Sequence, residues 1–132
     1  ELEHLGDTPL LNSIKATHSW CNTQAFEILP TREKQKQMLD QLQVATAPWQ
    51  FLAVPADLSQ AHEMLGDKLV VKSVRDGYDG KGQWRPVVGQ ASDIPAQAYG
   101  GLIAEAMVNF SREVSLVGAR FANGEYYFLS LR

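Results

Sequence analysis

The sequence predicts an α+β fold, for three reasons. Residues 32–42 repeat apolar side chains at helical spacing. Beyond Pro48 the pattern changes to short apolar runs typical of strands, with one further helix predicted at residues 58–65. Near the C-terminal end, Asn123-Gly124 is the strongest short-range signal for a β-hairpin. With 132 residues and 45% hydrophobic content, the chain is long enough to build one core.

The N-terminal third is predicted to be helical. Residues 7–29 carry only a weak pattern, for which we expect short helices or loops. Pro30-Thr31 then opens a clearer helix over residues 32–42. One face of this helix is apolar and is formed by Met38, Leu39 and Leu42. The opposite face is expected to be ordinary solvated surface and carries Glu33, Lys34, Lys36 and Asp40.

The remainder is predicted to form short strands around one helix. The strands are expected at residues 49–54, 68–74, 83–88 and 102–108. The helix at 58–65 stops at Gly66. The run 102–108 is almost continuously apolar, which is typical of a buried strand. Residues 113–120 and 126–131 flank the hairpin turn, so the order is a helical segment, a β-α-β-β-β unit and a final hairpin.

Composition argues against several classes of function. Twelve basic and fifteen acidic residues give a net charge of −3, without the basic stripe that nucleic-acid binding needs. No apolar stretch approaches the length of a membrane span, so we expect a soluble, cytoplasmic protein with no membrane partner. The single cysteine, Cys21, rules out an internal disulfide framework, and no histidine stands at metal-ligand spacing from it.

A glycine loop (residues 77–83) joins two of the predicted strands. Walker loops and dinucleotide fingerprints both lead into a helix, whereas Gln83 leads into a strand, so both of those interpretations fail. What remains is a strand-loop-strand flap that lays backbone N–H groups over a triphosphate. Gly77, Gly80 and Gly82 permit close approach of the backbone to a ligand, and Lys81 supplies charge.

Two charged residues interrupt the predicted strands. Strand alternation places Lys72 on the face of Val70 and Val74, so its ammonium group needs either an anion or a route to solvent, and both alternatives stay open. Glu105 lies within the apolar run 102–108 and either pairs with a structural cation or lines a nucleotide pocket. In the second case it holds a phosphate-binding lysine, and the backbone after it meets the base. Glu113 is then placed to reach ribose hydroxyls.

Four stretches of the chain carry a resemblance to a known family. They are GYDGKGQW, the preceding VVK, NFSREVSLVGAR and TREKQKQMLDQLQVATAPW. Together they closely resemble the N5-carboxyaminoimidazole ribonucleotide synthetases, which are ATP-grasp enzymes of purine synthesis. The match runs in order over nearly the whole chain. The resemblance implies a ligase that uses ATP to activate bicarbonate as carboxyphosphate and carboxylates the amine of aminoimidazole ribonucleotide, giving ADP and phosphate.

The resemblance also implies roles for individual residues. Arg32 and Lys72 would contact the nucleotide as cations, and Glu113 would bind the ribose. The flap over the phosphates would consist of Gly77, Tyr78, Asp79, Gly80, Lys81, Gly82 and Gln83. The strand that meets adenine would contain Glu105, Ala106, Met107 and Val108. Catalysis would rest on positioning and charge neutralisation. Asp76 stands where the family usually has a glycine, and it adds negative charge beside the phosphates.

On this resemblance the chain divides into three parts. Residues 1–44 would be the end of an N-terminal domain and a linker helix, 45–110 the ATP-grasp small subdomain, and 111–132 the truncated start of the large subdomain. The chain would be a central fragment, inactive alone, of an enzyme that is commonly homodimeric. The Mg²⁺ ligands and the reaction centre would lie outside it. Two alternatives remain: a nucleotide-binding module without catalysis, and an ATP-grasp carboxylase with another acceptor.

Overall fold

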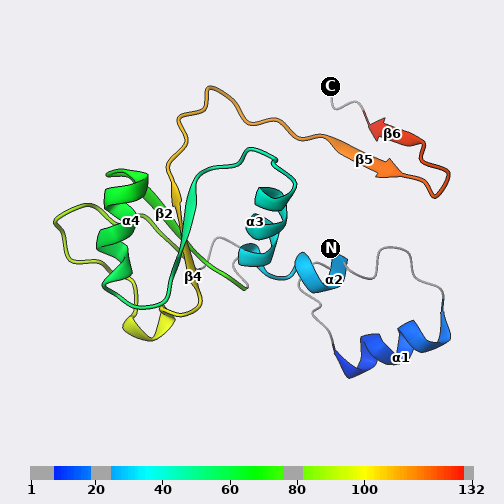
Figure 1. Cartoon of the computed structure of the whole chain (residues 1–132), viewed down its shortest axis with the longest axis horizontal. Coiled ribbons are helices and arrows are strands. Elements are labelled where there is room, and N and C mark those ends of the chain that lie inside the picture. Colours follow the sequence, from blue (N-terminus) through cyan, green and yellow to red (C-terminus); the bar gives the residue numbers. More distant parts are fainter. Residues whose placement is uncertain (1–7, 19–24, 76–81, 130–132) are drawn as a thin grey trace.

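A four-stranded antiparallel sheet forms the centre of the molecule (Figure 1). The computed structural model describes residues 8–18, 25–75 and 82–129. The strands lie in the order β1-β4-β2-β3. They are β1 (Trp49–Leu52), β2 (Leu69–Ser73), β3 (Gln83–Trp84) and β4 (Leu102–Ala106). The prediction of an α+β fold with a β-α-β-β-β unit is confirmed.

One face of the sheet carries the core. Helix α4 (Asp57–Leu65) covers this face, and its Ala61 is fully buried. Alternation along the strands turns Leu52, Leu69 and Val71 toward α4, and all three are at most 1% exposed. Leu58 and Leu65 of α4 pack against this cluster, which ties the helix to the sheet.

Helix α3 (Arg32–Gln41) lies on the opposite face of the sheet, as Figure 1 shows. Ile103 on this face is fully buried. The backbone N–H of Arg32 donates to the carbonyl of Val74 (2.9 Å), so α3 begins beside the end of β2. Near its other end, Trp49 Nε1 donates to Asp40 Oδ2 at 2.8 Å. The sheet is therefore sandwiched between two helices.

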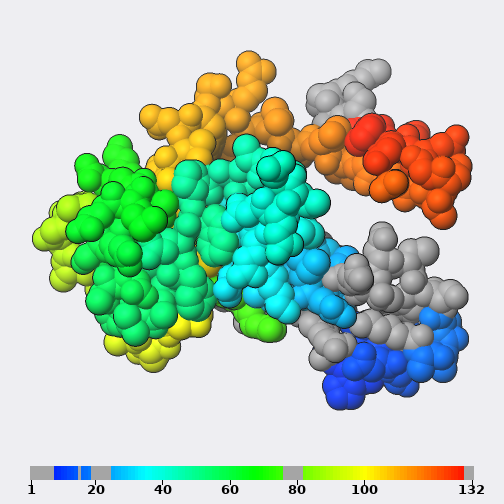
Figure 2. Space-filling view, in the orientation of Figure 1, coloured from blue at the N-terminus to red at the C-terminus, as the bar shows by residue number. Residues whose placement is uncertain are grey.

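The described residues also form two N-terminal helices and a C-terminal hairpin. Helix α1 (Pro9–Thr17) is capped by Thr8, whose hydroxyl accepts from the N–H of Leu11 at 3.2 Å, and α2 (Ala25–Ile28) precedes α3. A short 3₁₀ turn spans Ala96–Ala98. In the space-filling view (Figure 2), α1 and the hairpin project from the body that the sheet, α3 and α4 form. No helix in the described ranges is long and apolar enough to cross a membrane.

The hairpin predicted around Asn123-Gly124 is present. Strands β5 (Val117–Arg120) and β6 (Tyr126–Leu129) pair antiparallel, and Gly124 has a φ of +89°. That left-handed backbone is the reason for a glycine at this point of the turn. Both strands are exposed along their whole length.

Most predicted strands lose a residue or two at their ends, and two of them are shorter by four residues. The strand at 83–88 ends after Trp84, because Pro86 has no N–H to continue the ladder, and only an isolated bridge between Lys68 and Val87 follows. The strand at 113–120 begins at Val117, which pairs with Leu129. Glu113 is therefore not in a strand, contrary to the prediction.

The prediction for the surface of α3 is partly wrong. Leu42, assigned to the apolar face, is 64% exposed at the C-terminal end of the helix. Lys36, assigned to solvated surface, has a side chain only 12% exposed, because it points at the sheet. The helix contacts the sheet through charged side chains, Lys36 with Glu105 and Asp40 with Trp49.

Candidate functional site: two lysines on one buried carboxylate

Lys72 and Glu105 lie on neighbouring strands and on the same face of the sheet. Glu105 is opposite Val70 and Lys72 is opposite Ile103, so the two charged side chains are diagonal neighbours. Lys72 Nζ donates to Glu105 Oε2 at 2.7 Å. Their side chains are 28% and 12% exposed. Glu105 therefore pairs with a lysine, which both alternatives left open by the sequence allow.

A second lysine reaches the same carboxylate. Lys36 Nζ lies 3.4 Å from Glu105 Oε1, so one carboxylate is shared by two ammonium groups. Sequence reasoning missed Lys36. The available signal was its spacing from Arg32, because residues four apart lie on one face of a helix.

Arg32 stands at the first turn of α3, beside the end of β2. Its Nη1 donates to the carbonyl of Ser73 at 2.9 Å, and its backbone N–H donates to the carbonyl of Val74. The glycine loop begins at residue 77, four residues after the end of β2. Arg32 and the N-terminal end of a ten-residue helix therefore place positive charge at the base of the loop.

Only part of the glycine loop can be described. Gly77, Tyr78, Asp79, Gly80 and Lys81 lie outside the described residues. Gly82 has a φ of +65°, and its carbonyl accepts from the N–H of Ser73 at 2.8 Å. A Cβ at position 82 would lie 2.5 Å from Ser73 Oγ, so the close approach of the two strands favours glycine, as the positive φ does. Gln83 is directly opposite Lys72, on the face that carries the lysine.

At the end of β4, the backbone carbonyl of Ala106 lacks the hydrogen bond that β1 would otherwise donate to it. Ala106 N–H donates to the carbonyl of Pro48 at 2.9 Å, and Met107 N–H donates to the carbonyl of Lys68 at 3.0 Å. Proline has no N–H, so Pro48 cannot return a hydrogen bond to the carbonyl of Ala106. The strand ends at Ala106, and Met107 and Val108 continue it as exposed, irregular chain.

The last predicted residue, Glu113, lies outside the strands, four residues before the start of β5. It is exposed and lies between β4 and β5, in a segment that Figure 1 shows leading away from the four-stranded sheet. Its assignment to ribose stays a prediction.

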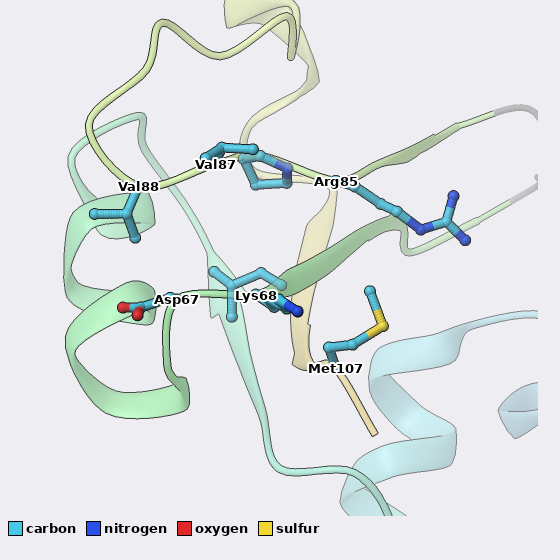
Figure 3. A pocket seen from close by; sticks show the side chains of 8 residues that line it. Asp67, Lys68, Arg85, Val87, Val88 and Met107 are labelled. Carbon is cyan, nitrogen blue, oxygen red and sulfur yellow. The ribbon is translucent and has the colours of Figure 1, made fainter. Parts of the chain in front are cut away.

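A cleft of about 440 Å³ opens at the start of β2, at the opposite end of that strand from the glycine loop. Its lining residues include Lys68, Arg85, Val87, Val88 and Met107. Figure 3 shows the side chains of Lys68 and Arg85 turned toward the side of the sheet where α3 lies. Among the predicted site residues that the structure describes, Met107 is the one that borders it.

No group of three or more His, Cys, Asp or Glu side chains that could hold a metal ion occurs among residues 8–18, 25–75 and 82–129. Glu105, on the strand beside the predicted phosphate region, already contacts lysines through both of its oxygens. The described residues therefore do not fit a magnesium site.

The chain is similar in sequence to proteins of known function. Over 131 residues the chain is 40% identical to the N5-carboxyaminoimidazole ribonucleotide synthase of Escherichia coli (strain K12), covering 99% of this chain and 37% of that protein. The chain thus spans little more than a third of that relative's length. The resemblance first drawn from the sequence motifs is confirmed.

The chain is also similar to solved structures. The N5-carboxyaminoimidazole ribonucleotide synthetase of Thermus thermophilus matches with a TM-score of 0.77 at 27% identity, over 97% of this chain and 34% of that one. The N5-carboxyaminoimidazole synthetase of Staphylococcus aureus, solved with ADP, matches with a TM-score of 0.69 at 28% identity, over 80% and 29%. Residues 37–131 match the ATP-grasp domain family. Since that match covers well over half of the chain, the chain belongs to the ATP-grasp family.

Proposed function

We propose that this chain is the nucleotide-binding part of an ATP-dependent ligase that carboxylates 5-aminoimidazole ribonucleotide with bicarbonate in purine biosynthesis. ATP would be converted to ADP and phosphate. The observation that carries the proposal is the cluster of Lys36, Lys72 and Glu105, in which two ammonium groups share one carboxylate beside the glycine loop. The name of the relatives, N5-carboxyaminoimidazole ribonucleotide synthase, supports the choice of the acceptor.

The cluster suits a polyanion. Two positive charges and one negative charge leave an excess of one positive charge at a site where the side chains are 12–28% exposed. An excess charge in such surroundings attracts an anion more strongly than it would in open water. Arg32 adds a further cation at the base of the loop. The triphosphate would lie between Arg32, Lys72 and the glycine loop.

The base would lie at the end of β4. The carbonyl of Ala106 receives no hydrogen bond from Pro48, so it can accept one from the amino group of adenine. Met107 and Val108 would continue along the base, and Glu113 would bind the ribose. Residues 45–110 would form the small subdomain, and residues 111–132 would begin the large one.

The chain's own residues would bind and orient the nucleotide. Phosphoryl transfer to bicarbonate needs the γ-phosphate held in line and its developing charge neutralised, and Arg32 and Lys72 would contribute that charge. Magnesium, which would supply further neutralisation, has no fitting ligand set among the described residues. We place its ligands, and the groups that bind bicarbonate and the ribonucleotide, elsewhere in the full-length protein.

The test is ADP release by the full-length protein, with aminoimidazole ribonucleotide and bicarbonate added separately and together. The proposal predicts that ADP release requires both and falls sharply in a Lys72→Ala variant. ADP release that does not depend on the ribonucleotide would point to an ATP-grasp carboxylase with another acceptor. ADP binding without any ADP release would favour a nucleotide-binding module without catalysis.

A further inference from the structure

Lys36 is held more firmly than Lys72. Its ammonium group lies 3.4 Å from Glu105 Oε1, 3.1 Å from the carbonyl of Ala47 and 3.3 Å from Thr46 Oγ1. An ammonium group has three donors, and these three acceptors match them. The side chain of Lys36 is 12% exposed, whereas that of Lys72 is 28% exposed. Of the two lysines on Glu105, Lys72 is therefore the one that can turn toward a ligand.

Any such turn changes the balance of charge on Glu105. When Lys72 approaches a phosphate oxygen, it gives up some or all of its 2.7 Å contact with Oε2. A carboxylate that is only 12% exposed is costly to leave without a counter-charge. Lys36 remains 3.4 Å from the other oxygen and supplies that counter-charge.

From these contacts we infer that Lys36 is a positioning residue for the nucleotide site. It holds the Glu105 carboxylate in place and neutralises it while Lys72 serves the phosphates. This role rests on the proposed function, because it acts on the nucleotide only through Glu105 and Lys72. Without Lys36, Glu105 would keep Lys72 as its sole partner in the cluster, and nucleotide binding would have to break that pair.

A purely structural role for Lys36 makes a different prediction. The same ammonium group links α3 to the carbonyl of Ala47 and the hydroxyl of Thr46, just before β1. If that link were its only role, losing Lys36 would lower the melting temperature, and any effect on nucleotide affinity would not depend on the charge of Glu105. The two roles are therefore separable by a double-mutant cycle.

The experiment measures the dissociation constant of ADP by calorimetry in the full-length protein, with the melting temperature recorded for each variant. Lys36→Met is expected to weaken ADP binding roughly fivefold to tenfold, the effect of losing one partly buried charge pair. Lys36→Arg, which keeps the charge, is expected to restore most of the affinity. Lys34→Met is the matched control: Lys34 is exposed on the same helix, and its loss removes the same charge.

The cycle combines Lys36→Met with Glu105→Gln. Because a neutral amide needs no counter-charge, the loss of Lys36 should change ADP affinity less than twofold in the Glu105→Gln background. An unchanged affinity in Lys36→Met alone, or an equal loss in both backgrounds, would overturn the inference and leave the proposed function standing. Failure of the wild-type protein to bind ADP would overturn both.

Discussion

Lys72 Nζ lies 2.7 Å from Glu105 Oε2 across strands β2 and β4, in a sheet whose other face is the apolar core. In the sequence each residue looks out of place within an apolar run. In the fold each residue supplies the counter-charge of the other, because the diagonal register brings one cation and one anion together on the face toward α3. The presence of Lys36 on the same carboxylate then makes the cluster cationic.

Removal of the shared carboxylate should destabilise the fold. Glu105→Ala leaves two lysines facing each other at a partly buried site, so we expect the free energy of unfolding to fall by roughly 1–3 kcal/mol. Urea denaturation of the 132-residue chain measures it. Glu63→Ala, at an exposed position of α4, should change it by less than about 0.5 kcal/mol. Equal effects at the two positions would mean that the cluster contributes nothing to stability.

Gly82 should be more sensitive to substitution than Gly89, although both have a positive φ of 65–75°. Gly82→Ala and Gly89→Ala both carry the strain of that backbone, about 1 kcal/mol. Only at position 82 would the new Cβ also meet Ser73 Oγ, at 2.5 Å, while nothing lies within 4 Å at position 89. We therefore expect Gly82→Ala to weaken ADP binding more, since the displaced Ser73 adjoins the glycine loop.

The contact can be isolated by a second substitution. Ser73→Ala removes the hydroxyl and should recover part of the affinity lost in Gly82→Ala. If the two glycine variants bind ADP equally, the close approach of Gly82 to Ser73 has no part in nucleotide binding.

Truncation of a buried leucine should destabilise the fold more than truncation of an exposed one. Leu52 is fully buried between the sheet and α4, so Leu52→Ala is expected to cost roughly 2–5 kcal/mol of unfolding free energy. Leu42 is 64% exposed, and Leu42→Ala should cost less than about 0.5 kcal/mol. A comparable loss at Leu42 would show that the apolar face first predicted for α3 is buried in solution.

The β5–β6 hairpin should make the 132-residue chain self-associate. Large apolar side chains are exposed along it and in the segment before it, including Leu116 at 73% and Tyr127 at 60%. Exposed strands with such side chains associate edge to edge. Sedimentation velocity should detect concentration-dependent association that Leu116→Lys with Tyr127→Lys reduces.

The matched control for the hairpin is Val54→Lys, at a 50%-exposed apolar residue between β1 and α4. This variant should associate as the wild-type chain does. A wild-type chain that stays monomeric at every concentration tested would rule out the hairpin as an association surface.

The sequence predicted those parts of the fold that depend on local pattern. The order of strands and helices followed from apolar spacing, and the hairpin turn from Asn123-Gly124. Pro86 could have been used to shorten the third strand, because proline cannot donate to a ladder. The charge cluster could be anticipated only in part, because the contact of Lys36 with Glu105 depends on how α3 docks against the sheet. Residues so far apart along the chain carry no local signal of contact.

The central claim is that Lys72 binds the nucleotide, and the dissociation constant of ADP in the full-length protein tests it most directly. A charged hydrogen bond to phosphate contributes roughly 1.5–3 kcal/mol, so Lys72→Met should weaken binding about 10- to 100-fold. Lys68→Met is the control, since Lys68 precedes the same strand and borders the cleft at its far end. The account predicts that Lys68→Met binds within about twofold of wild type; equal dissociation constants for wild type and Lys72→Met would contradict it.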